Sequence, residues 1–300
     1  MFSKQINVLI TAVLPCLMMI LMSCSQEPAV VATLEKPKLT IDNYPQADGS
    51  TACIPLMVQM YAEFCELSPD EAEGAVTASG DTAAAWGSIL NGDADFALVY
   101  EAPESLQSSI NENNLEITSI GRDALVFLVN NVNPVSNLTQ EQLIGIYTGE
   151  ITDWGSIGGK GPLKAFQRNE GNGSQTLFLK LLMKDIKPME PLIGLIPYPD
   201  GMGMMRGTAV YNGSEESIGY TVFYYADQMY QNPAIKLLSV DGTAPSAKSI
   251  QSGNYPLIND FYAVIRAAEP IGSPARQLRD WLLTAEGSQF LTGLGYISIN

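Results

Sequence analysis

Short apolar runs alternate with helical patterns along most of the chain. Residues 94–100 and 123–130 are apolar runs that predict strands, and the continuous run over 123–130 is typical of a strand covered on both faces. Around these runs, over 52–67, 82–90 and 139–149, apolar positions recur at helical spacing. This alternation predicts an α/β protein with mostly parallel sheets and flanking helices.

The rest of the chain supplies further elements of both kinds. Strands are expected over 38–42, 163–167, 217–225 and 261–266, and helices over 177–184 and 273–283. About 260 residues follow the N-terminal segment, and a chain of that length favours two domains over one large sheet.

The first 24 residues have the pattern of a lipoprotein signal peptide. Lys4 precedes an apolar run of 15 residues, 8–22, whereas a membrane-spanning helix needs about 20. The run ends in Leu-Met-Ser-Cys, which resembles a bacterial lipobox, so Cys24 is expected to carry lipid as the first mature residue. Residues 25–37 contain two prolines and are predicted to be a tether. The alternative is an ordinary signal peptide that contains a cysteine.

Two further cysteines follow Cys24 in the mature chain. Both of them, Cys53 and Cys65, lie in the predicted helix of residues 52–67. Their separation of 12 residues places them about 18 Å apart along a helix, far beyond the reach of a disulfide. We therefore predict two buried, unpaired thiols.

The composition excludes several classes of function. The chain has 32 acidic and 16 basic residues, and its formal net charge of −16 argues against a nucleic-acid partner. It contains no histidine, which removes Ser-His-Asp and Cys-His catalysis and His-bearing zinc sites. Ser174 has no obvious lysine base beside it, and the acidic residues are too sparse for a calcium loop. We therefore expect no enzyme activity, no cofactor and no metal.

Two segments join a strand to a helix through glycine-containing turns, Asp-Gly-Ser-Thr at 48–51 and Gly-Asn-Gly-Ser-Gln-Thr at 171–176. Such turns leave the first backbone N–H groups of a helix unpaired, which together with the helix dipole favours an anion. Arg168 precedes the second turn, where a guanidinium can hold a tetrahedral oxyanion, and Glu170 can hold that guanidinium in place. The alternative is a pair of ordinary helix caps and a surface Arg–Glu pair.

Several spaced landmarks follow the order found in one protein family. They are DGST at 48–51, GDADFALVYEAP at 92–103, GRDALVFLVNNVNP at 121–134, ITDW at 151–154 with GG at 158–159, RNEGNGSQT at 168–176, SIGY at 217–220 and YPLINDFYAVIR at 255–266. From about Leu39 onward the chain resembles the phosphate-binding proteins of bacterial ABC phosphate importers, within the type II periplasmic-binding-protein superfamily. The resemblance implies two α/β lobes, joined by a double crossover hinge, that close on phosphate.

The same resemblance implies a set of ligand-binding residues. Helix N-termini, hydroxyls and one Arg donate hydrogen bonds in that family, and an acidic residue accepts the proton of the ligand. Glu101 falls near that acidic residue, and Glu170 matches the acid that supports the Arg. The implied phosphate ligands are Ser50, Thr51, Ala52, Thr82, Glu101, Arg168, Asn172, Gly173 and Ser174.

Three positions depart from the family pattern. Glu101 replaces an Asp and is one methylene longer, and Asn172 replaces a Ser. Asp81 stands where the family has a Gly-Ser-rich turn, and its carboxylate would repel an anion if it faced the cleft. A carboxylate in the site accepts the proton of HPO₄²⁻ but repels fully ionised sulfate, so the selectivity of the site depends on where Glu101 lies.

We therefore predict an extracytoplasmic, lipid-anchored monomer, in the periplasm or on the cell surface, that binds inorganic phosphate or a similar oxyanion and delivers it to an ABC permease. Lobe 1 is expected to comprise residues 38–125 with 250–300, and lobe 2 residues 126–249. Two alternatives are a protein of the same fold that senses or binds another small ligand, and a surface lipoprotein that acts by protein–protein contact.

Overall fold

The computed structural model describes residues 36–76, 78–192, 204, 208 and 214–299. Residues 34–300 form one compact unit. The predicted signal peptide of residues 1–24, the predicted lipidation at Cys24 and the tether as far as residue 35 lie outside the described residues. In the described part of the chain, no helix is long and apolar enough to cross a membrane.

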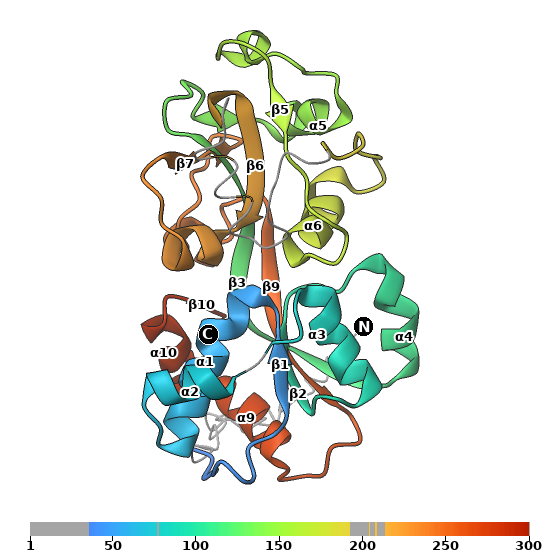
Figure 1. Ribbon diagram of the computed structural model, residues 1–300, viewed down its shortest axis with the longest axis vertical. Coiled ribbons are helices and arrows are strands. Elements are labelled where there is room, and N and C mark those ends of the chain that lie inside the picture. Colours follow the sequence, from blue (N-terminus) through green and yellow to red (C-terminus); the bar gives the residue numbers. More distant parts are fainter. Residues whose placement is uncertain (1–35, 77, 193–203, 205–207, 209–213, 300) are drawn as a thin grey trace, which may run out of the picture. The chain divides into compact units, whose positions relative to one another are not determined.

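Most of the strands form two sheets that share one long strand, β3 (Figure 1), and β4 and β8 form a separate two-stranded sheet. Residues 115–124 of β3 pair with β9, and residues 125–129 pair with β6. The chain therefore passes from one sheet into the other within a single strand. The strands of the described residues are β1 (Ala47–Gly49), β2 (Phe96–Val99), β3 (Leu115–Asn130), β4 (Asn137–Leu138), β5 (Lys164–Ala165), β6 (Ser217–Val222), β7 (Ile235–Leu237), β8 (Ser239–Val240), β9 (Ile258–Arg266) and β10 (Ile297–Ser298).

The strand directions are mixed, so the prediction of mostly parallel sheets is wrong on this point. The pairs β1–β2, β5–β6 and β4–β8 are parallel. In contrast, β9 is antiparallel to β2 and β3, and β3 is also antiparallel to β6, β7 and β10. The reason is topological, because β3 leads the chain into the second sheet and β9 follows its return. The predicted α/β class is confirmed.

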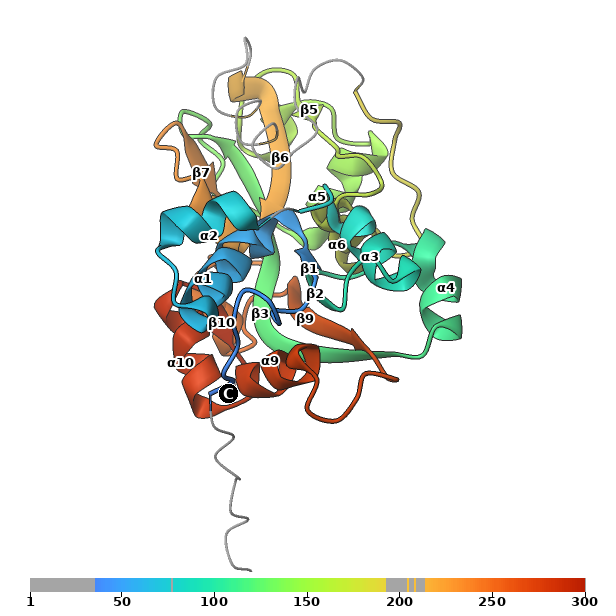
Figure 2. The same cartoon turned by 60° about the horizontal axis from the view of Figure 1, so that its bottom comes forward.

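Helices surround both sheets. In Figure 1, α1, α3, α9 and α10 lie around β1 and β2, whereas α5 and α6 lie beside β5 and β6, and Figure 2 shows β3 passing between these groups. The α-helices of the described residues are α1 (Ile54–Cys65), α2 (Pro69–Ala75), α3 (Thr82–Asn91), α4 (Gln107–Glu112), α5 (Gln140–Thr148), α6 (Gly173–Leu177), α8 (Ala247–Gln251), α9 (Pro274–Leu282) and α10 (Ala285–Gly293). Shorter helical segments are η1 (Thr51–Cys53), η2 (Glu104–Leu106), η3 (Trp154–Ile157), η4 (Phe178–Met183), η5 (Ser214–Glu216) and η6 (Tyr225–Met229).

Residues 38–42 do not form the predicted strand, because the chain has no regular structure over 38–40 and turns at 41–43. The Thr40 carbonyl accepts the N–H groups of Asn43 and Tyr44, and the Asn43 side chain accepts the Thr40 N–H at 2.7 Å. An Asn side chain that bonds to nearby backbone in this way competes with strand pairing. The first strand therefore begins later, at β1.

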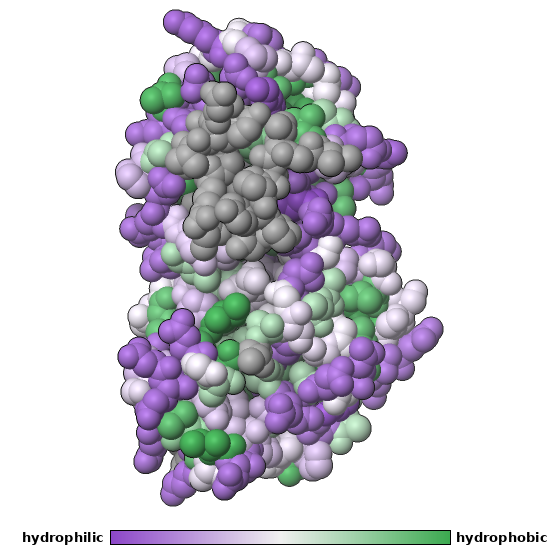
Figure 3. Space-filling view, viewed as in Figure 1, coloured by the Kyte–Doolittle hydropathy of each residue, from purple (hydrophilic) through white to green (hydrophobic). Residues whose placement is uncertain are grey.

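Apolar side chains fill the space between sheets and helices. Residues 124–129 of β3 are completely buried. Phe127, Tyr147, Phe178 and Tyr220 pack ring against ring, with centroids 4.5 to 6.0 Å apart. Figure 3 shows a surface on which polar residues are widespread and apolar ones form small groups. The shared strand is therefore the centre of the core.

Cys53 and Cys65 are free thiols, as predicted. Cys53 is buried in η1, and burial raises the pKa of its thiol. Cys65, the last residue of α1, is only partly buried. The prediction of two buried thiols is thus correct for Cys53 alone, because 12 residues of helix turn the second cysteine to another face.

Asp123 is a buried carboxylate at the point where β3 leaves the first sheet. It accepts hydrogen bonds from the Tyr100 hydroxyl at 2.6 Å and from the N–H groups of Ala124 at 2.7 Å and Tyr224 at 3.1 Å. The predicted strand over 217–225 ends as β6 at Val222, and the chain continues helically where Tyr224 bonds to Asp123. Burial raises the pKa of Asp123 to about 6.

We expect the stability contributed by Asp123 to fall as pH rises. Its pKa is about 6 in the folded chain against an ordinary value of 3.8, so the contribution is greatest below 3.8 and is lost as pH rises through 6. Asp123→Asn removes this titration and leaves the other carboxylates as they are. Between pH 4 and pH 7, the unfolding free energy of wild type minus that of the variant should fall by roughly 2 kcal/mol in urea denaturation. A difference that stays constant with pH would contradict this account.

Candidate functional site

The first segment of the site lies where β1 ends and η1 begins. A side chain does not fit at Gly49, since a Cβ there would lie 2.7 Å from the Leu98 carbonyl oxygen. Ser50 follows and is buried. Its Oγ accepts hydrogen bonds from the Thr82 hydroxyl at 2.9 Å and the Tyr100 N–H at 3.1 Å. The bond from Thr82 ties this turn to the start of α3.

The start of α3 contacts the loop that follows β5. The Ala83 N–H donates to the Gly171 carbonyl at 3.0 Å. A Cβ on Gly171 would lie 2.3 Å from Asp81 Oδ2, and a Cβ on Gly173 would lie 2.6 Å from Thr82 Oγ1. The two segments therefore approach closely because these positions are glycine.

Arg168 is held in that same loop at both its backbone and its guanidinium. Its N–H donates to Gln175 Oε1 at 3.1 Å and to the Tyr220 hydroxyl at 3.2 Å. The guanidinium donates to Ser174 Oγ at 3.4 Å and to Asn172 Oδ1. Burial raises the pKa of Tyr220, so its hydroxyl stays protonated at neutral pH.

Helix α6 begins at Gly173, four residues before the predicted start at 177, and continues as the π-helical segment η4. The N–H groups of Gly173 and Ser174 therefore belong to a first helical turn, which has no preceding helical carbonyls to accept them. Thr51 and Ala52 have the same position in η1. Both ends of the site thus offer backbone donors.

These segments enclose a small cavity of about 20 Å³. Eight of the residues predicted to bind a ligand line it together, namely Ser50, Thr51, Ala52, Thr82, Arg168, Asn172, Gly173 and Ser174. The lining is completed by Asp81, Tyr100, Thr221, Val222 and Tyr225. The sequence predicts only repulsion of an anion by Asp81, and the other four residues lie in or beside apolar strands whose pattern predicts core positions. We call this space the anion cavity.

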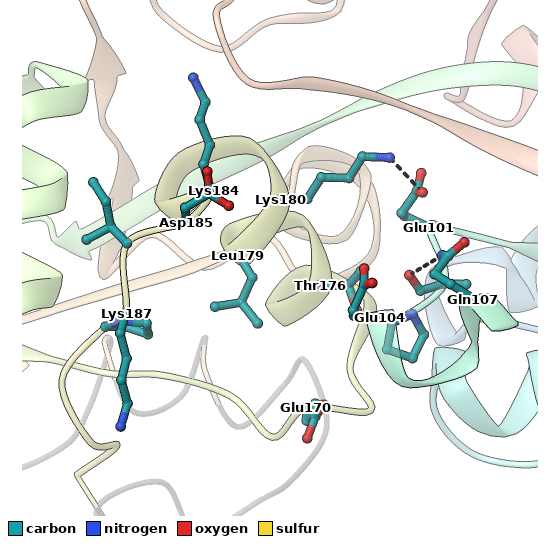
Figure 4. Close-up of a pocket in the computed structure, with 14 residues that line it drawn as sticks. Glu101, Glu104, Gln107, Glu170, Thr176, Leu179, Lys180, Lys184, Asp185 and Lys187 are labelled. Atoms are coloured by element: carbon teal, nitrogen blue, oxygen red, sulfur yellow. Dashed lines mark hydrogen bonds and ion pairs between the residues drawn. The ribbon is translucent and has the colours of Figure 1, made fainter.

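Glu101 and Glu170 line a different and larger cavity of about 890 Å³. Glu101 Oε1 forms an ion pair with Lys180 Nζ at 2.6 Å, and its Oε2 accepts the Tyr262 hydroxyl at 3.3 Å. Figure 4 shows Lys180 of η4 meeting Glu101 at the side of this cavity. The structure therefore places Glu101 with Lys180, outside the anion cavity.

The anion cavity is rich in hydrogen-bond donors. Its lining combines one guanidinium, several hydroxyls and two helix starts, with Asp81 as the acidic side chain among the lining residues. Fixed donors of this kind suit a small tetrahedral oxyanion. Among the residues that the structure describes, no group of three or more acidic or cysteine side chains is arranged to hold a metal ion.

Comparison with known sequences gives one family and a set of related proteins. The profile of the family described as "PBP superfamily domain" matches residues 36–286. The phosphate-binding protein PstS of Bacillus subtilis (strain 168) is 24% identical over 259 residues, which cover 84% of this chain and 79% of that protein. PstS of Borreliella burgdorferi is 22% identical over 264 residues, which cover 84% of this chain and 88% of that protein.

Solved structures give the same result at the level of the fold. A putative phosphate ABC transporter substrate-binding protein with bound phosphate, from Clostridium perfringens, superposes with a TM-score of 0.64 at 19% identity, over 85% of this chain and 99% of that chain. An ABC-type phosphate transport receptor from Vibrio cholerae has a TM-score of 0.59 at 21% identity, over 84% and 98%. The predicted two-lobed fold is confirmed by these similarities.

Ser50→Ala should destabilise the fold. The substitution removes the buried acceptor of the Tyr100 N–H and the Thr82 hydroxyl, which we expect to lower the unfolding free energy by roughly 1–3 kcal/mol. Thr51→Ala is the matched control, since the Thr51 hydroxyl has no partner among the described residues, and its effect should stay within about 0.5 kcal/mol. Urea denaturation measures both. Equal effects of the two substitutions would contradict the role given to Ser50.

Proposed function

Because the chain belongs to the PBP superfamily domain family, we propose that it is the solute receptor of an ABC importer and that its ligand is inorganic phosphate. The relatives that are named phosphate-binding proteins support this choice of ligand. So does the similarity in fold to a receptor solved with bound phosphate. In this proposal the protein binds and releases its ligand without covalent chemistry.

The observation that supports the proposal most strongly is that hydrogen-bond donors from segments beside both sheets line the anion cavity together. Ser50 directly follows β1 and Thr82 begins α3, whereas Arg168 lies in the loop after β5 and Ser174 lies in α6. A ligand that contacts both groups holds the two lobes together. Release requires the lobes to separate, which is the behaviour expected of a transport receptor.

The donors are sufficient for tight binding. A helix N-terminus contributes about 0.3–1 kcal/mol toward an anion and sometimes ~2, and a charge-assisted hydrogen bond contributes about 1.5–3 kcal/mol. Two helix starts, several hydroxyls and the Arg168 guanidinium can together reach the ~8 kcal/mol of micromolar affinity. Micromolar or tighter binding of phosphate is therefore expected.

We also propose an organisation around this site. Residues 38–125 with 250–300 form lobe 1, and residues 126–249 form lobe 2. The pairing of β3 supports this division, because β3 pairs with β9 as far as Ala124 and with β6 from Leu125. The apolar run before Cys24 supports a lipid anchor outside the cytoplasm, with the protein acting as a monomer on its permease.

A receptor for another small oxyanion is the second candidate. It is favoured by the position of Glu101, which is engaged by Lys180 instead of lining the anion cavity, and by Asn172 at a position where the family has Ser. Competition between phosphate and other oxyanions for the same site distinguishes the two candidates.

Arg168→Ala should weaken phosphate binding by at least about tenfold, since it removes the cationic donor of the anion cavity. Isothermal titration of the full chain in detergent, freed of bound anion by partial unfolding and refolding, measures the affinity. Arg122→Ala is the control, because Arg122 pairs with Asp260 and lies outside the anion cavity. An unchanged affinity in a folded Arg168→Ala protein, shown by its circular dichroism, would refute the site.

A further inference from the structure

We propose that Asp81, and not Glu101, is the carboxylate that selects an oxyanion carrying a proton. The inference rests on the proposed phosphate function and assigns its selectivity to one residue. It follows from the position of Asp81 in the anion cavity, from the partners that occupy Glu101, and from the acid–base chemistry of the candidate ligands.

Asp81 is fixed at the meeting point of the two lobes. Its Oδ1 accepts the Ala84 N–H at 3.1 Å as the N-cap of α3. Its Oδ2 lies 2.3 Å from the point that a Cβ on Gly171 would occupy, so the carboxylate packs against the opposite loop. The bond from the Ala83 N–H to the Gly171 carbonyl holds the two segments in this contact. The glycine at 171 therefore makes room for the carboxylate beside the anion cavity.

Asp81 is also the one acidic side chain among the residues that line the anion cavity. Arg168 lines the same cavity, so a cation and an anion face one small space. A site built for a fully ionised oxyanion gains nothing from that carboxylate, because like charges repel. The carboxylate becomes favourable when the ligand presents a hydrogen-bond donor.

Both carboxylate oxygens of Glu101 already interact with other side chains. Lys180 Nζ lies 2.6 Å from its Oε1, and the Tyr262 hydroxyl lies 3.3 Å from its Oε2. Both carboxylate oxygens thus have partners, and Figure 4 shows the pair with Lys180 at the larger cavity. Lys180 lies on η4 of the second group of elements, so this ion pair contributes to the contact between the lobes rather than to the ligand.

The chemistry of the ligands then gives the selectivity. Inorganic phosphate and arsenate carry at least one proton at neutral pH, and that O–H donates to the carboxylate. Sulfate carries none, so its oxygens meet the Asp81 charge without relief. An Asn at the same position keeps a good helix cap and offers an amide donor to sulfate. The substitution Asp81→Asn therefore removes the charge and retains the fold.

The test is isothermal titration of the full chain in detergent with phosphate, arsenate and sulfate at pH 7.5. Wild type, Asp81→Asn and Glu101→Gln are compared, and Asp81→Ser provides a second variant with a capping side chain. We expect wild type to bind phosphate and arsenate directly and sulfate only weakly, with the sulfate affinity measured by its competition with phosphate. In both Asp81 variants the ratio of phosphate to sulfate affinity should fall by at least about tenfold. Glu101→Gln should leave that ratio within about threefold of wild type.

Other outcomes are distinguishable. If wild type binds neither phosphate nor arsenate, the proposed function fails and this inference fails with it. If wild type binds phosphate and sulfate equally, the anion cavity remains but the selective role of Asp81 is overturned. If Glu101→Gln lowers the ratio while the Asp81 variants keep it, the selecting carboxylate is Glu101 and the inference is wrong.

Discussion

The backbone contact between the start of α3 and the loop after β5 is the interaction on which the anion cavity depends. The Ala83 N–H reaches the Gly171 carbonyl at 3.0 Å, and glycines at 171 and 173 allow the two segments to come that close. Each segment alone is a helix start with a few hydroxyls, which is a common arrangement. Brought together, they surround one space with donors from two sheets, and the shared strand β3 keeps those sheets in one fold.

The net charge of −16 at first conflicts with a site for an anion. The conflict is resolved by distance, because surface charges are screened beyond about 8 Å at physiological ionic strength. Inside the cavity, the Arg168 guanidinium and the helix starts act at contact range. The acidic surface then affects mainly the rate of association, which should be slower and more sensitive to salt than for a neutral protein.

Much of the architecture could be predicted from sequence, because it follows from local patterns. The periodicity over 82–90 and 139–149 corresponds to α3 and α5, and the apolar run over 123–130 corresponds to the buried end of β3. Strand direction could not be predicted in this way, since pairing depends on partners far away in sequence. The turn at 41–43 was missed because it depends on the side chain of a single residue, Asn43.

Part of the candidate site could likewise be predicted from local sequence patterns, and part of it could not. Residues 168–176 form a contiguous motif, and the place of four of them around the anion cavity could be predicted from it, namely Arg168, Asn172, Gly173 and Ser174. Asp81 and Glu101 each have a position that depends on a contact with a residue far away in sequence, Gly171 in one case and Lys180 in the other. No local pattern contains those contacts, so only the folded chain reveals which carboxylate lines the cavity.

The most direct test of the central claim is a crystal structure of the protein grown with phosphate. The account predicts tetrahedral density in the anion cavity, in contact with the Arg168 guanidinium, the Ser174 hydroxyl and the start of η1. Density at Lys180 in the larger cavity, with none beside Arg168, would contradict it.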